Sequence, residues 1–225
     1  MMTATLTIDP SRLLHLDVTS AAITRPDGDT SNEFTWWNGN VLSETDSLIE
    51  KINDAASGTT ILAWSGNLSP HFFESLPMTW LRPGREAFNG VLEKVTPLLK
   101  EKGVTLCFRP CARHVLSDPQ SCMQFLLAHE DAPLAIALDP AAMFETSMLN
   151  TPEDHLVRMF ETLGDRCAAA VLSDVPDPGA EDEPTHFERP LQLGVGRLPV
   201  ETIQALLDRT VPASIPVMMP SKTGS

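Results

Sequence analysis

The sequence predicts an α/β fold in which parallel strands are covered by helices on both faces. Two observations lead to this prediction. Short apolar runs bounded by turn residues alternate with amphipathic helical windows along most of the 225 residues, which is typical of buried parallel strands and the helices between them. Three of the apolar runs begin at residues 104, 134 and 167. These intervals match the length of one strand–helix unit, which is about thirty residues.

Six apolar runs are predicted strands. They cover residues 13–23, which is the least regular run, 59–64, 104–109, 134–139, 167–173 and 215–219. Side chains alternate between the two faces of a strand. In their strands, Arg109 and Asp139 fall on the face with the smaller side chains, which should point inward. Both also stand at the carboxyl end of their strand, where α/β barrels carry their binding chemistry.

Helices are expected between these strands. Three windows with apolar residues on one face, each followed by a glycine, cover residues 43–57, 85–101 and 152–163. Ser43 with Asp46 resembles a capping arrangement for the first of these helices. Pro119 and Pro199 are expected in the first turn of two further helices.

The composition disfavours several classes of partner. The chain has 30 acidic and 16 basic residues, and its formal net charge is −14. Nucleic acids and anionic membrane surfaces both require a basic face, so we expect neither as a partner. No apolar run approaches the length of a spanning helix, and the N-terminus lacks the pattern of a signal peptide. We therefore expect a cytoplasmic protein with a single domain over residues 1–225. Its four cysteines lack metal-ligand spacing and are expected to be buried thiols.

Five short motifs are informative because of their order. The segments are GVTLCFRP, IALDPAAMF, AAVLSDV, LGVGRLPVETIQALL and IPVMMP. In this order and spacing they resemble the xylose-isomerase-like TIM barrels, which include sugar-phosphate isomerases and epimerases and enzymes of the endonuclease IV type. The resemblance covers roughly residues 45–220 and implies a TIM-barrel-like parallel β/α barrel. The chain before residue 13 is too short for two strand–helix units, so we expect an incomplete barrel of six or seven strands.

The resemblance also implies a divalent metal held by Glu, Asp, His and Glu at four successive strand ends. The matching positions in this sequence are Arg109, Asp139, Val171 and Met219. Asp139 is therefore the only retained metal ligand, although the nearby Asp174 of the same motif is also kept. One carboxylate beside a guanidinium does not satisfy a divalent cation. We expect neither a bound metal nor another cofactor.

We expect the Arg109 guanidinium to replace the charge of the metal by lying against Asp139 in a charge-assisted hydrogen bond. Such a pair would either be purely structural or anchor an anionic or polyol ligand. The remaining candidate pocket residues are Asp174, Trp64, His71, His186 and Met219.

The leading functional hypothesis is a degenerate sugar isomerase/epimerase-like barrel. It would have lost the usual metal site and would bind a small polar or carbohydrate-derived ligand. One alternative is an active isomerase or epimerase with a rearranged site around Arg109, Asp139 and Asp174. Another is a non-catalytic interaction scaffold that uses Trp36, Trp37 and the acidic, Pro-rich loop 175–190 as contact surfaces. We also expect an open barrel edge, which a homo-oligomer would cover.

Overall fold

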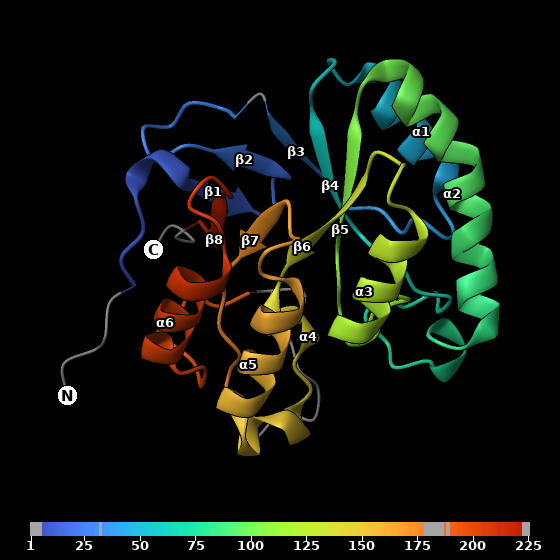
Figure 1. Ribbon diagram of the computed structural model, residues 1–225. Coiled ribbons are helices and arrows are strands. Elements are labelled where there is room, and N and C mark those ends of the chain that lie inside the picture. The colour runs from blue at the N-terminus through green and yellow to red at the C-terminus, as the bar shows by residue number, and fades with distance from the viewer. Residues whose placement is uncertain (1–5, 32, 178–186, 188–189, 222–225) are drawn as a thin grey trace. The chain divides into compact units, whose positions relative to one another are not determined.

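A computed structural model of the chain describes residues 6–31, 33–177, 187 and 190–221. The chain forms two compact units, which are described one at a time (Figure 1). The first unit comprises Met1–Thr30 and Leu138–Ser225, and the second unit comprises Ser31–Ala137. No helix in the described ranges is long and apolar enough to cross a membrane.

The second unit contains a parallel sheet. Its strands pair in the order β3 (Phe34–Trp37), β4 (Thr60–Trp64), β5 (Thr105–Arg109) and β6 (Leu134–Leu138). The connecting helices are α1 (Thr45–Asp54), α2 (Arg82–Lys102), which follows the short 3-10 helix η2 (Pro77–Thr79), and α3 (Pro119–Ala128). Parallel neighbours need a crossover connection, and each connection in this unit contains one of these helices.

Aromatic rings attach α2 and α3 to β5. The ring centroid of Phe108 in β5 lies 5.0 Å from that of Phe88 in α2 and 5.6 Å from that of Phe125 in α3. Arg109 is the next residue along the strand, so its side chain points to the opposite face, away from these helices. The alternation predicted for residues 104–109 is confirmed.

The first unit contains a mixed sheet in which the strands have the order β2 (Ala22–Thr24), β1 (Leu13–Asp17), β8 (Val217–Pro220) and β7 (Ala169–Val171). Its helices are η1 (Pro10–Arg12), α4 (Pro140–Met143), η3 (Thr146–Asn150), α5 (Pro152–Leu163) and α6 (Val200–Thr210). Helices α5 and α6 lie side by side in Figure 1, and Arg209 donates to Glu161 between them at 2.8 Å. The predicted helix at 152–163 is confirmed.

The sequence predictions are wrong at several places. The single strand expected at 13–23 is two strands, because a turn between β1 and β2 reverses the chain. Trp36 and Trp37 do not form a contact surface, since they lie in β3 with only 2% and 8% of their surfaces exposed. Helix α1 begins after Glu44, and no side chain caps it. Similarly, Pro199 is the N-cap of α6 and does not lie in its first turn.

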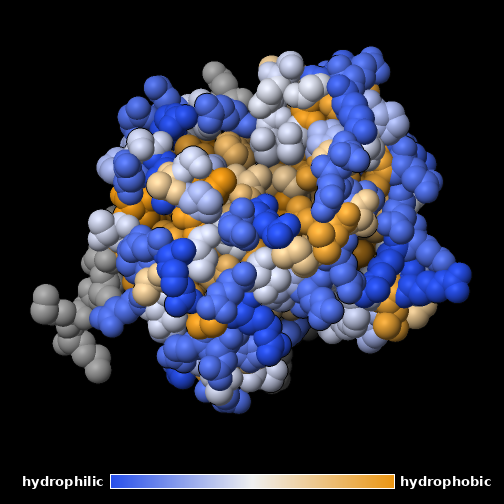
Figure 2. Space-filling model, in the orientation of Figure 1, coloured by the Kyte–Doolittle hydropathy of each residue, from blue (hydrophilic) through white to orange (hydrophobic). Residues whose placement is uncertain are grey.

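Two broader predictions hold. Seven of the described strands lie in parallel pairings, and β2 is antiparallel to β1, so the expected six or seven parallel strands are confirmed. No α-helix separates β1, β2 and β3 among the described residues, so the strand–helix alternation begins only at α1. All four cysteines are free and buried, as predicted. The face in Figure 2 is mostly hydrophilic, particularly along the exposed sides of α2 and α5.

Candidate functional site

The carboxyl ends of β3, β4 and β5 bring an arginine and two indole rings together. Arg109 ends β5 and is only 2% exposed. Its guanidinium carbon lies 4.0 Å from the ring centroid of Trp64 and 4.9 Å from that of Trp36. The strand register places Trp64 directly opposite Arg109. A guanidinium over an indole face is a favourable cation–π arrangement, so the cation is held in a defined position.

His114 extends this group of rings on the far side of Trp64. Its ring is stacked on Phe73, with centroids 5.4 Å apart, and meets Trp64 edge-on at 5.5 Å. The Nε2 atom lies 3.0 Å from the carbonyl oxygen of Phe72. We call Trp36, Trp64, Phe72, Phe73, Arg109 and His114 the aromatic cluster.

The imidazole of His114 is neutral at physiological pH. Complete burial, with a smaller contribution from the charge of Arg109, lowers the pKa of His114 to about 3. A neutral imidazole has one donor and one acceptor nitrogen. Since Nε2 faces a carbonyl oxygen, it carries the hydrogen and donates, and Nδ1 is left as an acceptor.

Two buried ring nitrogens of the aromatic cluster lack a hydrogen-bond partner among the described residues. They are the acceptor Nδ1 of His114 and the donor Nε1 of Trp36. Both rings contact Trp64, with centroid distances of 5.5 and 5.7 Å. An unsatisfied buried polar group costs about 1–3 kcal/mol, and in native proteins water or a ligand usually satisfies it. A hydroxyl group both donates and accepts, so it suits either atom.

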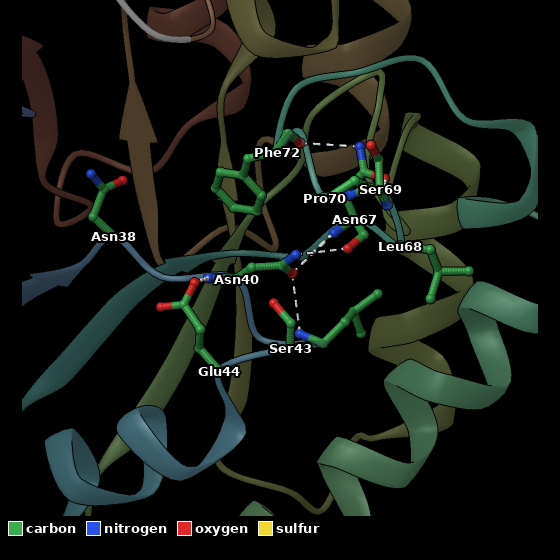
Figure 3. A pocket seen from close by; sticks show the side chains of 10 residues that line it. Asn38, Asn40, Ser43, Glu44, Asn67, Leu68, Ser69, Pro70 and Phe72 are labelled. Carbon is green, nitrogen blue, oxygen red and sulfur yellow. Dashed lines mark hydrogen bonds between the residues drawn. The ribbon is translucent and has the colours of Figure 1, made fainter.

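A pocket of 480 Å³ adjoins the aromatic cluster, and Phe72 belongs to both (Figure 3). The loops that follow β3 and β4 supply its lining residues, which are Asn38, Asn40, Leu42, Ser43, Glu44, Asn67, Leu68, Ser69, Pro70 and Phe72. Two buried amides join these loops. Asn40 Nδ2 donates to the carbonyl oxygen of Asn67 at 2.7 Å, and Asn40 Oδ1 accepts from the Asn67 amide at 3.2 Å.

Gly66 makes this close approach of the two loops possible. Its φ angle is +85°, a conformation that residues with a side chain rarely adopt. A Cβ atom at this position would lie 2.7 Å from Cγ2 of Val41 and 3.0 Å from Oδ1 of Asn40. The pocket therefore depends on a glycine shortly after β4.

Asn67 holds the loop of residues 67–79 in place. Its Nδ2 donates to the carbonyl oxygens of Phe72 at 3.0 Å, Glu74 at 2.8 Å and Arg113 at 3.0 Å. Its Oδ1 accepts from Oγ1 of Thr79 at 2.7 Å. All of these contacts lie within the second unit, so the walls of the pocket are largely pre-formed.

Asp174 follows β7 in the first unit and binds backbone groups. Its Oδ1 accepts from the amides of Val175 and Leu198, both at 2.9 Å, and its Oδ2 accepts from Gly194 at 2.8 Å and Gly196 at 2.9 Å. A carboxylate offers about four acceptor positions. A Cβ atom at position 196 would lie only 2.2 Å from the carbonyl oxygen of Val175. Asp174 and the Gly194-x-Gly196 segment therefore form a loop anchor.

The other predicted residues lie in different places. Asp139 directly follows β6, is completely buried, and accepts from the Ala142 amide at 3.3 Å as the N-cap of α4. Met219 lies in β8 and is partly buried. His71 is exposed in loop 67–79, and His186 lies outside the described residues. Of the predicted residues, the structure brings Arg109 and Trp64 together, and the pairing of Arg109 with Asp139 stays a prediction.

The positions that match the metal ligands of the resemblance do not fit a divalent cation. A hard cation needs several oxygen or imidazole ligands. Arg109, Val171 and Met219 supply none, and the nearby Asp174 is occupied by four backbone amides. Over the described residues, no group of three or more His, Cys, Asp or Glu side chains is placed to hold a metal ion.

Sequence reasoning misses Trp36 and His114 as members of this site. The sequence pattern places Trp36 in a surface loop because β3 is short and its apolar run is brief. No periodic signal marks His114, which follows β5 in a loop. Its place depends on contacts with loop 67–79, which lies about forty residues earlier in the chain.

No protein-family model matches this chain, and no curated protein matches it. Several solved structures are similar to it. The probable 3-DHS dehydratase AsbF of Bacillus anthracis aligns with a TM-score of 0.60 and 13% identity, over 85% of this chain and 69% of that one. An L-ribulose 3-epimerase aligns with a TM-score of 0.56 and 15% identity, over 83% of this chain and 59% of that one. Endonuclease IV from Thermus thermophilus aligns with a TM-score of 0.54 and 14% identity, over 84% of this chain and 69% of that one.

These similarities define the fold of the protein. An epimerase, a dehydratase and an endonuclease IV align over more than four fifths of this chain. The chain has the xylose-isomerase-like TIM-barrel fold, as the order of its motifs predicts. It spans only about 59% of the length of the L-ribulose 3-epimerase. At these identities the similarity establishes the fold, and one such fold carries many different activities.

Proposed function

We propose that this chain binds a small carbohydrate-derived ligand at the carboxyl ends of β3, β4 and β5 without a divalent metal. The proposal rests mainly on Arg109. This residue stands where the resemblance implies the first metal-binding Glu, and its guanidinium is held against two indole rings. A guanidinium carries a permanent charge and five donors, so it would attract ligand oxygens in place of a metal ion.

The surroundings of Arg109 suit a hydroxylated ligand. The acceptor on His114 and the donor on Trp36 are both buried, and hydroxyl groups of a sugar can satisfy either one. The indole rings offer apolar surface for the carbon skeleton of the same ligand. A D-allulose 3-epimerase from Methylomonas sp., solved in complex with D-allulose, has a similar fold, with a TM-score of 0.54 and 16% identity. Ketohexoses are therefore the first compounds to test.

The test combines metal analysis with thermal unfolding of the purified chain. We expect substoichiometric Mn, Mg, Co and Zn. We also expect D-allulose to stabilise the protein equally with and without EDTA, by about 2.7 kcal/mol at a hundredfold excess over its dissociation constant. Stoichiometric metal, or stabilisation that EDTA abolishes, would contradict the proposal. Failure of D-allulose, D-fructose and their phosphates to stabilise the chain would contradict it too.

A variant of Arg109 shows whether the guanidinium contacts the ligand. Arg109→Lys keeps the charge but loses the planar group that lies over the two indole rings. We expect this variant to fold and to bind D-allulose about tenfold more weakly, as the loss of a charge-assisted hydrogen bond would cause. Unchanged affinity would exclude a role for Arg109 in ligand binding. Arg109→Met, which also removes the charge, should bind no better than Arg109→Lys.

A further inference from the structure

The pocket between the loops after β3 and β4 has an unusual electrostatic character. Glu44 is the only ionisable side chain that lines it, and no lysine, arginine or histidine of the described residues does. The whole chain carries a formal net charge of −14. A phosphate or carboxylate would therefore meet no opposite charge in this pocket, whereas a cation would meet one.

The carboxylate of Glu44 is positioned and is available to a ligand. Its Oε1 accepts from the backbone amide of Asn40 at 3.3 Å, which limits its rotation. Gly39 leaves room for Oε2, since a Cβ atom at that position would lie 2.8 Å from it. No basic side chain of the described residues pairs with Glu44.

Phe72 adds an aromatic ring to the same pocket. In Figure 3 the side chains of Phe72 and Glu44 lie on either side of Asn40. An aromatic face attracts a cation by about 0.5–2 kcal/mol according to its exposure. Asn38 and Ser43 also line the pocket, and their side chains make no hydrogen bond to other described residues. They can therefore bind the hydroxyl groups of a ligand.

We propose that this pocket binds a small hydroxylated primary amine. Its ammonium group would pair with the Glu44 carboxylate and lie near the ring of Phe72, and its hydroxyl groups would bind Asn38 and Ser43. The rigid amides of Asn40 and Asn67 form the floor on which the ligand rests. This inference goes beyond the function proposed above, because it requires neither Arg109 nor the buried ring nitrogens of the aromatic cluster.

Three related sugars separate the charge of the ligand from its shape. D-glucosamine carries an ammonium group, D-glucose a hydroxyl group at the same position, and D-glucose 6-phosphate an added anion. We expect calorimetry at pH 6.5, where a typical amine is protonated, to detect binding of D-glucosamine in clear preference to the other two. Equal affinity for D-glucose, tighter binding of the phosphate, or no binding of D-glucosamine would overturn the proposal.

Variants assign the binding to Glu44. Glu44→Gln keeps an oxygen acceptor for the Asn40 amide but removes the charge, and we expect it to bind D-glucosamine about tenfold more weakly. The matched control is Glu50→Gln, which removes an exposed charge of α1 outside the pocket and should leave affinity unchanged. Equal affinity in wild type and Glu44→Gln would refute the assignment, provided that melting of the free protein shows both variants folded.

A further variant distinguishes this site from the one around Arg109. Arg109→Lys should leave D-glucosamine binding unchanged, whatever it does to D-allulose. If Arg109→Lys abolished D-glucosamine binding while Glu44→Gln did not, the amine would bind at the aromatic cluster and the present proposal would be wrong.

Discussion

Asp174 serves the backbone, although its position at a strand end suggests chemistry. Its carboxylate accepts four amide hydrogens, two of them from the glycines at positions 194 and 196. Such charge-assisted bonds are roughly twice as strong as bonds between neutral groups. A carboxylate in this arrangement stabilises a loop after β7, and it has little capacity left for a ligand.

Replacement of Asp174 by asparagine should therefore destabilise the protein strongly. The amide nitrogen of the variant would face two backbone N–H groups that are donors themselves. Two unsatisfied buried donors cost about 2–6 kcal/mol together. The control is Asp177→Asn, because the pair of Arg197 with Asp177 is at least half exposed and should contribute less than about 1 kcal/mol. Urea unfolding at pH 7 measures both values, and equal losses in the two variants would refute the loop-anchor role.

At the scale of elements, loop 67–79 is held by side chains from its own first residue and from the loop after β5. Asn67 donates to three of the carbonyl oxygens around it, His114 donates to that of Phe72, and Arg113 donates to that of Phe73 at 2.9 Å. The loop therefore acts as a fixed wall of the pocket. The burial of His114 that helps to hold it also makes this attachment sensitive to pH.

The effect of His114 on stability has a definite sign. Burial lowers the pKa of His114 to about 3 in the folded chain, whereas the unfolded chain protonates near 6.5. Below pH 6.5 the unfolded state therefore binds more protons, and stability falls as the pH is lowered. Between pH 7 and pH 4.5 this single group should account for a loss of roughly 2–3 kcal/mol.

The variant His114→Gln isolates that contribution. Glutamine can still donate to the carbonyl oxygen of Phe72, but it does not titrate. We expect the variant to be less stable than wild type at pH 7, because it lacks the ring contacts, and to lose less stability between pH 7 and pH 4.5. Carboxylates and the other histidines titrate in both proteins, so their effects cancel in the comparison. Parallel pH curves from urea unfolding would show that His114 is already solvated in the folded state.

For the whole molecule, the acidic charge distinguishes this chain from a nucleic-acid enzyme of the same fold. Endonuclease IV from Thermus thermophilus is structurally similar, but the present chain has 30 acidic against 16 basic residues. Binding to a phosphate backbone depends on basic groups that release counterions. The expected single domain, cytoplasmic location and homo-oligomer also belong to this scale, and they stay predictions.

We predict no measurable association with duplex DNA, even at low salt, where electrostatic binding is strongest. Fluorescence anisotropy of a labelled duplex, with and without an abasic site, checks this expectation. Saturable binding that weakens as salt is added would contradict it and would point to a basic surface formed by local clustering.

Much of the fold was predictable because it depends on local patterns. Strands such as β4, β5 and β6 and the longer helices α1, α2 and α5 coincide with predicted segments, because buried strands and amphipathic helices leave periodic signals. The confusion of β1 and β2 with one strand has a clear reason. Both have apolar residues, and the turn between them contains neither glycine nor proline.

The sequence by itself determined the fold class, the parallel strands and the residues that stand at the strand ends, because these follow from residue periodicity and from the order of short motifs. Only the tertiary structure decided what the polar groups at those strand ends do. It placed Arg109 against Trp36 and Trp64, bound Asp174 to the backbone and joined the loops after β3 and β4 into a pocket. The reason is physical: these roles depend on contacts between residues far apart in the chain, and no local pattern encodes such contacts.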